Sequence, residues 1–280
     1  MTEEDVARLN IAVLLPCYNE GKSIASVVIG FRKALPAARI YVYDNNSSDD
    51  TSAQAAFAGA TVVPSRRQGK GNVVRQMFAD IEADVYVMAD GDGTYDPTAA
   101  PRMIDTLLAD RADMVVGTRR NVTEDAGRNG HAFGNRLFNM IYRALFGSDF
   151  TDIFSGYRAF TRRFAKSFPA SSPGFEIETE MSVHASTLRL PVSEIEFDYG
   201  RRVEGSESKL STFRDGFRIL RMMGMLMDSL SRARVEQKRI HYLSIAPARG
   251  EKHFRGSGSV SDRREADQAI SAPQIRKTSA

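Results

Sequence analysis

Short apolar runs alternate with amphipathic segments along the first part of the chain. Five runs are rich in β-branched and aromatic residues, as buried strands are, and they occupy residues 11–16, 39–44, 61–64, 84–90 and 113–117. The segments between them, at 23–35, 51–59, 71–81 and 98–110, carry apolar residues three and four positions apart, which is typical of helices. This alternation predicts an α/β fold with a mostly parallel, twisted sheet flanked by helices.

The second half of the chain is less regular. We expect helices at 131–147, 174–190 and 211–230, a loop and strand at 151–160, and a strand at 192–200. The apolar face predicted for the last helix consists of Phe213, Phe217, Leu220, Met223, Met227 and Leu230.

The composition changes near residue 231. Residues 232–280 hold 11 Lys+Arg and 5 Asp+Glu, although the net charge of the whole chain is only +3. We therefore expect one catalytic domain over 1–231, followed by a basic, flexible tail over 232–280. Because the basic balance belongs to the tail, it argues against a nucleic-acid-binding protein.

Other features bear on the compartment. The chain has a single cysteine, Cys17, which excludes a disulfide framework and fits a reducing, cytoplasmic environment. The acidic, polar N-terminus is unlike a secretory signal. No run approaches the ~18 apolar residues that a membrane-spanning helix needs.

Each of the five predicted strands is followed by a polar, Gly-rich or charged loop. In chain order these loops read PCYNE, DNNSSDDT, SRRQGKG, DGDGTYDP and GTRR. Ligands of such sheets bind outside the carboxyl ends of the strands. The loops therefore predict one shared binding crevice.

Asp90 and Asp92 lie one residue apart where the fourth strand ends. Carboxylates this close repel each other, so a cation is expected between them. Two such carboxylates, together with phosphate oxygens and water, suit Mg²⁺ or Mn²⁺. A calcium-binding EF-hand loop is excluded because Tyr95 and Pro101 stand where it needs Gly and Glu. The alternative is a solvated turn, which the four other polar loops disfavour.

Further candidates lie in the neighbouring loops. Asp44 ends the second strand, where an acid commonly binds a ribose hydroxyl or a base edge. Lys70 opens a helix and is placed to approach a phosphate, although its glycines lack dinucleotide or P-loop spacing. Arg119, Arg202 and Lys209 are candidates for an anionic acceptor or a leaving phosphate, with plain solvation as the alternative.

A set of motifs occurs in a fixed order between residues 10 and 230: PCYNE, DNNSSDDT, RQGKG, DGDGTYDP, VVGTR, SGYRAF, GFEIETEM and RRVEGSESKLST. In this order they resemble the inverting family-two glycosyltransferases with a GT-A fold. Among these, the dolichyl- and polyprenyl-phosphate mannosyl- and glucosyltransferases are the most similar.

The resemblance implies a role for each matching residue. The residues that would hold the base and ribose of the nucleotide are Pro16, Tyr18, Glu20, Asp44 and Asn46. Lys70 and Gly71 would lie near the nucleotide. Asp90 and Asp92 would bind Mg²⁺ or Mn²⁺ together with the diphosphate. Those that would face the acceptor phosphate or shape the acceptor end are Arg119, Asp152, Ser155, Arg158, Arg202, Ser208 and Lys209. The catalytic group would be Asp92, Arg119 and Arg202.

The reaction implied is the metal-dependent, inverting transfer of glucose or mannose from a UDP- or GDP-sugar to a polyprenyl or dolichyl phosphate. Such an acceptor is already an anion, so positioning and charge neutralisation suffice without a strong base. We would expect this enzyme in the cytoplasm, with peripheral contact at the cytoplasmic face of the membrane. The sequence names neither the sugar nor the nucleotide.

Three other functions are open to comparison. One is a glycosyltransferase with a soluble saccharide or small-molecule acceptor in cell-envelope polysaccharide synthesis. Another is a non-catalytic nucleotide-sugar-binding homologue, which the presence of both Asp90 and Asp92 disfavours. A dinucleotide-dependent oxidoreductase is rejected, because PCYNEGK stands where the G-x-G-x-x-G loop would be.

The chain departs from the family pattern at its C-terminal end. Many relatives carry membrane helices there, where this chain has a basic, polar segment. Our hypotheses are that 232–280 is a lineage-specific tail, or that a truncated or shifted reading frame removed such helices. Smaller departures are Cys17, for the alanine common in relatives, and Val203, for a proline.

Overall fold

The computed structural model describes residues 9–120, 129–147, 149–200 and 216–228. Its strands are β1 (Ile11–Cys17), β2 (Arg39–Asp44), β3 (Thr61–Pro64), β4 (Val85–Met88), β5 (Met114–Arg120), β6 (Arg158–Thr161) and β7 (Val192–Asp198). Its helices are α2 (Ile24–Ala34), α3 (Thr51–Phe57), α4 (Lys70–Asp80), η1 (Pro97–Ala99), α5 (Ala100–Ala109), α6 (Asn129–Phe146), α7 (Arg162–Ser167) and α8 (Ile177–Leu188), and a further helix covers 216–228.

The strands form one sheet in the order β3-β2-β1-β4-β6-β5-β7. Neighbouring strands run parallel except at β6, which pairs antiparallel with both β4 and β5. The prediction of a mostly parallel α/β sheet is confirmed. Because β4 and β5 both oppose β6, they run parallel to each other, and the carboxyl ends of β1 to β5 lie at one edge.

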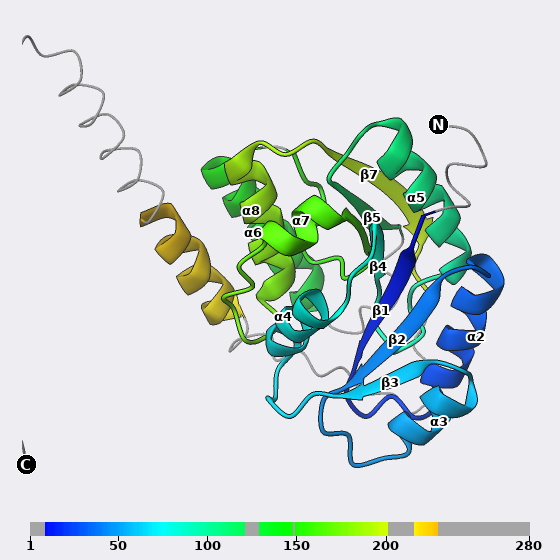
Figure 1. The fold of residues 1–280 in the computed structure, drawn as a ribbon. Helices are drawn as coiled ribbons and strands as arrows, with labels where there is room; N and C mark the ends of the chain where they lie inside the picture. The colour runs from blue at the N-terminus through cyan, green and yellow to red at the C-terminus, as the bar shows by residue number, and fades with distance from the viewer. Residues whose placement is uncertain (1–8, 121–128, 148, 201–215, 229–280) are drawn as a thin grey trace, which may run out of the picture. The chain divides into compact units, whose positions relative to one another are not determined.

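Helices cover both faces of the sheet (Figure 1). One face packs against α2, α3 and α5, and the other against α4, α6, α7 and α8. Strand β1 shows why its sequence is apolar throughout: Val13 and Leu15 enter one core, while Ala12 and Leu14 enter the other. A parallel strand between two helical layers is buried on both sides, so its apolar residues need not alternate with polar ones.

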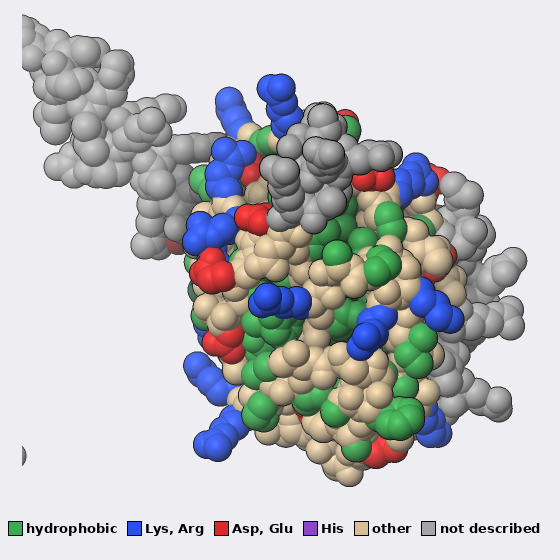
Figure 2. All heavy atoms as spheres, turned by 45° about the vertical axis from the view of Figure 1, so that its right-hand side comes forward, with side chains coloured by type: hydrophobic (Ala, Val, Ile, Leu, Met, Phe, Trp, Pro, Cys, Tyr) green, Lys and Arg blue, Asp and Glu red, His purple; other side chains and the backbone are tan. Residues whose placement is uncertain are grey.

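Charged side chains are dispersed on the face that carries α2 and α5. In Figure 2, Lys and Arg side chains stand singly around this face, with apolar side chains and backbone between them. Solvated, separated charges of this kind give no concentrated basic field on this face.

The helix at 216–228 packs differently from the prediction. Ile219 and Met223 are its buried residues, whereas Phe217 and Leu220 are 69% and 44% exposed. A side chain at Gly216 would meet the ring of Phe138, so α6 approaches the helix closely at this point. The predicted face is therefore wrong for Phe217 and Leu220, because contact with the rest of the domain selects Ile219 instead. Phe213 and Leu230 lie outside the described residues.

The residues 201–215 and 229–280 also lie outside the described ranges, so the division into a domain over 1–231 and a tail over 232–280 stays a prediction. None of the helices in the described ranges combines the length and apolarity that crossing a bilayer requires.

Arg158 occupies the core at the start of β6. Its side chain is completely buried, and its guanidinium donates to the carbonyls of Ser155 (2.8 Å) and Ile153 (3.0 Å) and to Ser182 Oγ (3.0 Å). Burial lowers the pKa of Arg158, and the neighbouring acids Glu178 and Asp152 partly oppose this shift. Arg158 therefore holds the 153–155 loop from inside the core, and its expected part in shaping the acceptor end stays a prediction.

We predict that Arg158→Met lowers the free energy of unfolding by about 3 kcal/mol, because buried acceptors lose their donors. Urea denaturation followed by circular dichroism measures the change. The matched control is Arg162→Met: Arg162 is exposed and pairs with Glu82, so its loss should cost less than about 1 kcal/mol. Equal stability of the two variants would contradict a structural role for Arg158.

Candidate active site

The loops after β1 and β2 are tied together at the carboxyl edge of the sheet. Asn19 N donates to Ser47 Oγ (2.9 Å), and Ser48 N donates to Asn19 Oδ1 (2.8 Å). Glu20 N donates to Thr51 Oγ1 at the start of α3 (2.8 Å). These bonds make the two loops one wall of a shared edge site. The wall contains three predicted nucleotide residues: Pro16 and Glu20 are buried, and Tyr18 is exposed.

Asp44, predicted to bind the nucleotide, ends β2 and is bonded to its own loop and to α3. Its carboxylate accepts from Ser47 N (3.0 Å) and from the hydroxyl of Ser52. Asn46, another predicted nucleotide residue, is exposed in a left-handed conformation, and its amide donates to Arg66 O (2.9 Å). Each carboxylate oxygen can accept more than one hydrogen bond, so these contacts leave Asp44 able to accept from a ligand.

Asn45, between these two residues, holds the loop after β3. Its side chain is buried and donates to the carbonyls of Ser65 (2.9 Å) and Arg67 (2.8 Å). Its Oδ1 accepts from Gly69 N (2.7 Å). Gly69 has a φ of 121°, a backbone conformation that residues other than glycine rarely adopt. Helix α4 therefore starts at a fixed place, with Lys70 as its first residue.

Lys70 joins three elements through two ion pairs. Its ammonium contacts Asp90 at the end of β4 and Glu178 in α8, and the Lys70 and Glu178 side chains are 10% and 5% exposed. Asp90 keeps 30% of its side chain exposed. A Cβ on Gly156 would lie only 3.0 Å from Asp90 Oδ2 and 3.1 Å from Lys70 Nζ, so this position leaves little room for any side chain.

The charges in this cluster are strongly coupled. Burial by itself would lower the pKa of Lys70, but Asp90 and Glu178 outweigh burial and hold the pKa above its usual value. Burial raises the pKa of Glu178, and Asp90 raises it further, against the opposing effect of Lys70. The Glu178 Oε2 atom is buried and has no hydrogen-bond partner among the described residues. Two carboxyl groups, of Asp90 and Glu178, thus share the ammonium of Lys70.

Asp92 is fixed by its own turn. It is 5% exposed, and its Oδ1 accepts from Thr94 N (3.1 Å) and Thr94 Oγ1 (2.6 Å). The turn also binds the loop after β1, because Ser23 Oγ donates to Gly91 O (2.7 Å). The loops after β1 and β4, both predicted to line the crevice, are therefore in contact.

The donor set fits a hard divalent cation. Asp90 and Asp92 offer carboxylate oxygens, and no group of three His, Cys, Asp or Glu that could hold a metal occurs among the described residues. An ion held by two carboxylates would take its remaining ligands from water and phosphate oxygens, as Mg²⁺ commonly does.

Arg119, at the end of β5, forms a second charged pair. Its Nε and Nη2 donate to the two oxygens of Asp152 (2.7 and 2.8 Å), and its guanidinium lies 5.5 Å from the ring centre of Tyr199. Burial tends to lower the pKa of Arg119, but Asp152 outweighs it and raises the pKa. The bidentate contact fixes the plane of the guanidinium and leaves Nη1 to other acceptors.

Two other predicted residues are buried below the site. Ser155 is fully buried and donates from Oγ to Gly117 O (2.5 Å). Gly71 is buried, and a Cβ there would clash with the carbonyl of Ser172. They support the walls of the site. Arg202, Ser208 and Lys209 lie outside the described residues, and the roles assigned to all the site residues stay predictions.

Two residues of the site, Glu178 and Tyr95, were not predicted from the sequence. In the structure Tyr95 is 4% exposed and its hydroxyl accepts from Gly156 N (2.8 Å), next to Asp90. The available signal was the three acids within the otherwise apolar stretch GFEIETEM, since buried acids need partners.

Comparison with known proteins places this site in context. Residues 12–168 match the family model described as glycosyl transferase family 2. Glycosyltransferase AglJ of Haloferax volcanii is 38% identical over 208 residues, which cover 74% of this chain and 68% of that protein. An undecaprenyl-phosphate mannosyltransferase of Micrococcus luteus is 26% identical over 220 residues, covering 72% and 88% of the two chains.

The fold also has solved counterparts. Glucosyl-3-phosphoglycerate synthase from Mycobacterium tuberculosis, crystallised with Mn²⁺, UDP and glucosyl-3-phosphoglycerate, superposes with a TM-score of 0.66 at 23% identity, covering 79% of this chain and 82% of that one. At this identity the likeness concerns the fold, and it confirms the expected GT-A fold. The family match extends over more than half of the chain, so the protein belongs to glycosyl transferase family 2 and is a glycosyltransferase that acts on nucleotide sugars.

Proposed function

We propose that the protein transfers a hexose, glucose or mannose, from a UDP- or GDP-sugar to a polyprenyl phosphate, with inversion at the transferred carbon. The Micrococcus luteus relative, named for transfer to undecaprenyl phosphate, supports this acceptor class. In this chain, the observation that supports a lipid acceptor is an exposed apolar surface on α6 and the 216–228 helix.

The donor would lie along the edge formed by the loops after β1, β2 and β4. Asp90 and Asp92 are the residues that would hold Mg²⁺ or Mn²⁺, which offsets the charge on the leaving diphosphate. Mn²⁺ accompanies UDP in the Mycobacterium structure, which supports a divalent ion here. Lys70 sets the position of Asp90, and Arg119, oriented by Asp152, would draw the acceptor phosphate towards the donor.

Exposed apolar side chains gather on two helices. Ten large hydrophobic side chains are exposed among the described residues, and six of them lie on α6 and the 216–228 helix: Leu137, Met140, Leu145, Phe217, Leu220 and Met225. The exposed arginines Arg143, Arg218 and Arg221 lie on the same helices. Apolar residues with arginines among them suit the interface of an anionic bilayer, where a polyprenyl phosphate would be presented.

A soluble phosphorylated acceptor is the second candidate. The Mycobacterium enzyme of the same fold was also crystallised with Mn²⁺, UDP-glucose and phosphoglyceric acid, which supports a small anionic acceptor. Both candidates present a negatively charged group to Arg119, and they differ in whether the acceptor has a lipid chain.

We predict that Asp92→Asn lowers the rate of hexose transfer at least about 100-fold, because the carboxylate proposed to hold the metal and diphosphate loses its charge. Asp96→Asn is the matched control: Asp96 is exposed and caps η1 through Thr98 N (2.9 Å). Its transfer rate should stay within about twofold of the wild type. Full activity of Asp92→Asn with saturating Mn²⁺ would refute the role of Asp92.

The acceptor class can be determined with radiolabelled UDP-glucose and GDP-mannose, each in the presence of Mn²⁺. With undecaprenyl phosphate in detergent, we expect label to enter the organic phase. A parallel reaction with 3-phosphoglycerate as acceptor should leave the label in the donor. Transfer to phosphoglycerate alone would replace the lipid proposal by the soluble one.

We predict that Met140→Glu/Phe217→Glu weakens binding to vesicles of anionic phospholipid about tenfold, since each change opposes insertion of an apolar side chain. Flotation of the protein with vesicles measures the effect. Phe57→Glu is the control, because Phe57 is 89% exposed but lies on α3, at the other face of the sheet. Equal loss in both variants would show a general charge effect.

A further inference from the structure

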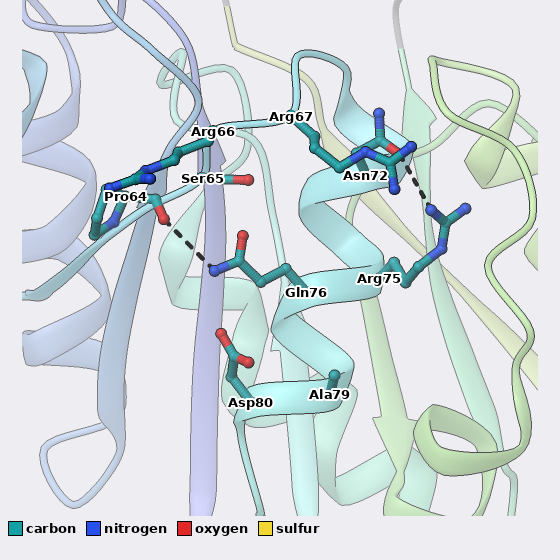
Figure 3. Close-up of a pocket in the computed structure, with 9 residues that line it drawn as sticks. All are labelled: Pro64, Ser65, Arg66, Arg67, Asn72, Arg75, Gln76, Ala79 and Asp80. Atoms are coloured by element: carbon teal, nitrogen blue, oxygen red, sulfur yellow. Dashed lines mark hydrogen bonds between the residues drawn. The ribbon is translucent and has the colours of Figure 1, made fainter.

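A cavity lies between β3 and α4, beside the proposed donor crevice. It measures about 530 Å³, within the range of small-molecule sites. Pro64, Ser65 and Arg66 line it from the end of β3, and Asn72, Arg75, Gln76, Ala79 and Asp80 line it from α4, with Arg67 on the connecting loop (Figure 3). Because it extends to Asp80, the last residue of α4, the cavity leads away from the carboxyl ends of the strands.

The cavity has an excess of positive charge. Arg66 and Arg67 are exposed and have no acidic partner within the described part of the chain. Arg75 donates from Nε and Nη2 to Ala170 O, from Nη2 also to Ser171 O (3.1 Å), and from Nη1 to Asn72 Oδ1 (3.2 Å). Those neutral acceptors fix the position of the guanidinium but leave its charge uncompensated. The residues that line the cavity thus include three arginines and one acid, Asp80.

A buried hydroxyl also lacks a partner here. Ser65 is 1% exposed, and its Oγ makes no hydrogen bond among the described residues. In Figure 3 the hydroxyl points from the strand towards α4. Buried hydroxyls are normally hydrogen-bonded, and an unsatisfied one beside a cavity is a mark of an absent ligand or water.

The two ends of the cavity differ in chemistry. Arg67 and Arg75 lie at the end nearer the start of α4, whereas Asp80 lies at the opposite end (Figure 3). Arginine forks match the oxygens of a phosphate, and a carboxylate accepts hydrogen bonds from hydroxyl groups. Gln76, between the two ends, can both donate and accept.

We propose that this cavity binds a phosphorylated sugar, with its phosphate at the exposed side chains of Arg66 and Arg67 and its hydroxyls towards Gln76 and Asp80. The site is distinct from the donor crevice but linked to it, because the loop that carries Arg66 and Arg67 continues into Lys70. Asn45 bonds that same loop to the end of β2. A bound sugar phosphate would therefore hold the segment that positions Lys70 beside Asp90.

Isothermal titration calorimetry with glucose 6-phosphate tests the proposal on the full chain. We expect binding to the wild type, and binding that persists in Mn²⁺ with saturating UDP or GDP. Neutral glucose should not bind, and inorganic phosphate should bind more weakly. Displacement of glucose 6-phosphate by UDP or GDP would place it in the donor crevice and overturn the proposal, as would the absence of any binding.

Two variants separate the arginine contacts from the volume of the cavity. Arg66→Gln/Arg67→Gln should weaken binding at least about tenfold, because charge-assisted hydrogen bonds are lost. Ala79→Leu should weaken it comparably by filling space, since Ala79 is exposed on α4 and the change is tolerated by a helix. Arg102→Gln, an exposed position on α5, should bind as the wild type does. Unchanged binding in both cavity variants would overturn the proposal.

Discussion

The contact of Lys70 with Asp90 and Glu178 is the interaction on which the rest of the site depends. Its three members come from the start of α4, the end of β4 and the first turn of α8. A buried charge without its partner is strongly unfavourable, so the three elements must meet in one arrangement. Asp90 remains 30% exposed within this contact, so its carboxylate can also offer an oxygen to a divalent ion.

The surrounding backbone is built to permit this contact. Gly156 leaves space beside Asp90 and Lys70, and Asn45 fixes the loop from which α4 begins. Arg158 braces the 153–155 segment from within the core. These residues need not touch a substrate to matter, because a shift of the loops that they hold would move the charged groups directly.

The proposed binding sites lie on one face of the sheet. Helices α4, α6 and α8 share one face, which carries the ion cluster, the apolar surface proposed for lipid contact and the cavity proposed for a sugar phosphate. Helices α2, α3 and α5 cover the other face. Both proposed anion sites adjoin the short loop between β3 and α4, so one segment connects the binding of two charged ligands.

The strands, most helices and the meeting of five polar loops at one edge could be predicted from the sequence, because burial patterns and turn residues depend on neighbouring positions in the chain. The sequence also singled out Asp90, Asp92 and Lys70. It did not reveal that β6 runs antiparallel, that Glu178 reaches Lys70, that Arg158 is internal, or which side of the 216–228 helix is buried. These features became visible in the tertiary structure, because each depends on contacts between residues that are distant in the chain. The free energy of a buried charge or apolar side chain depends on those contacts.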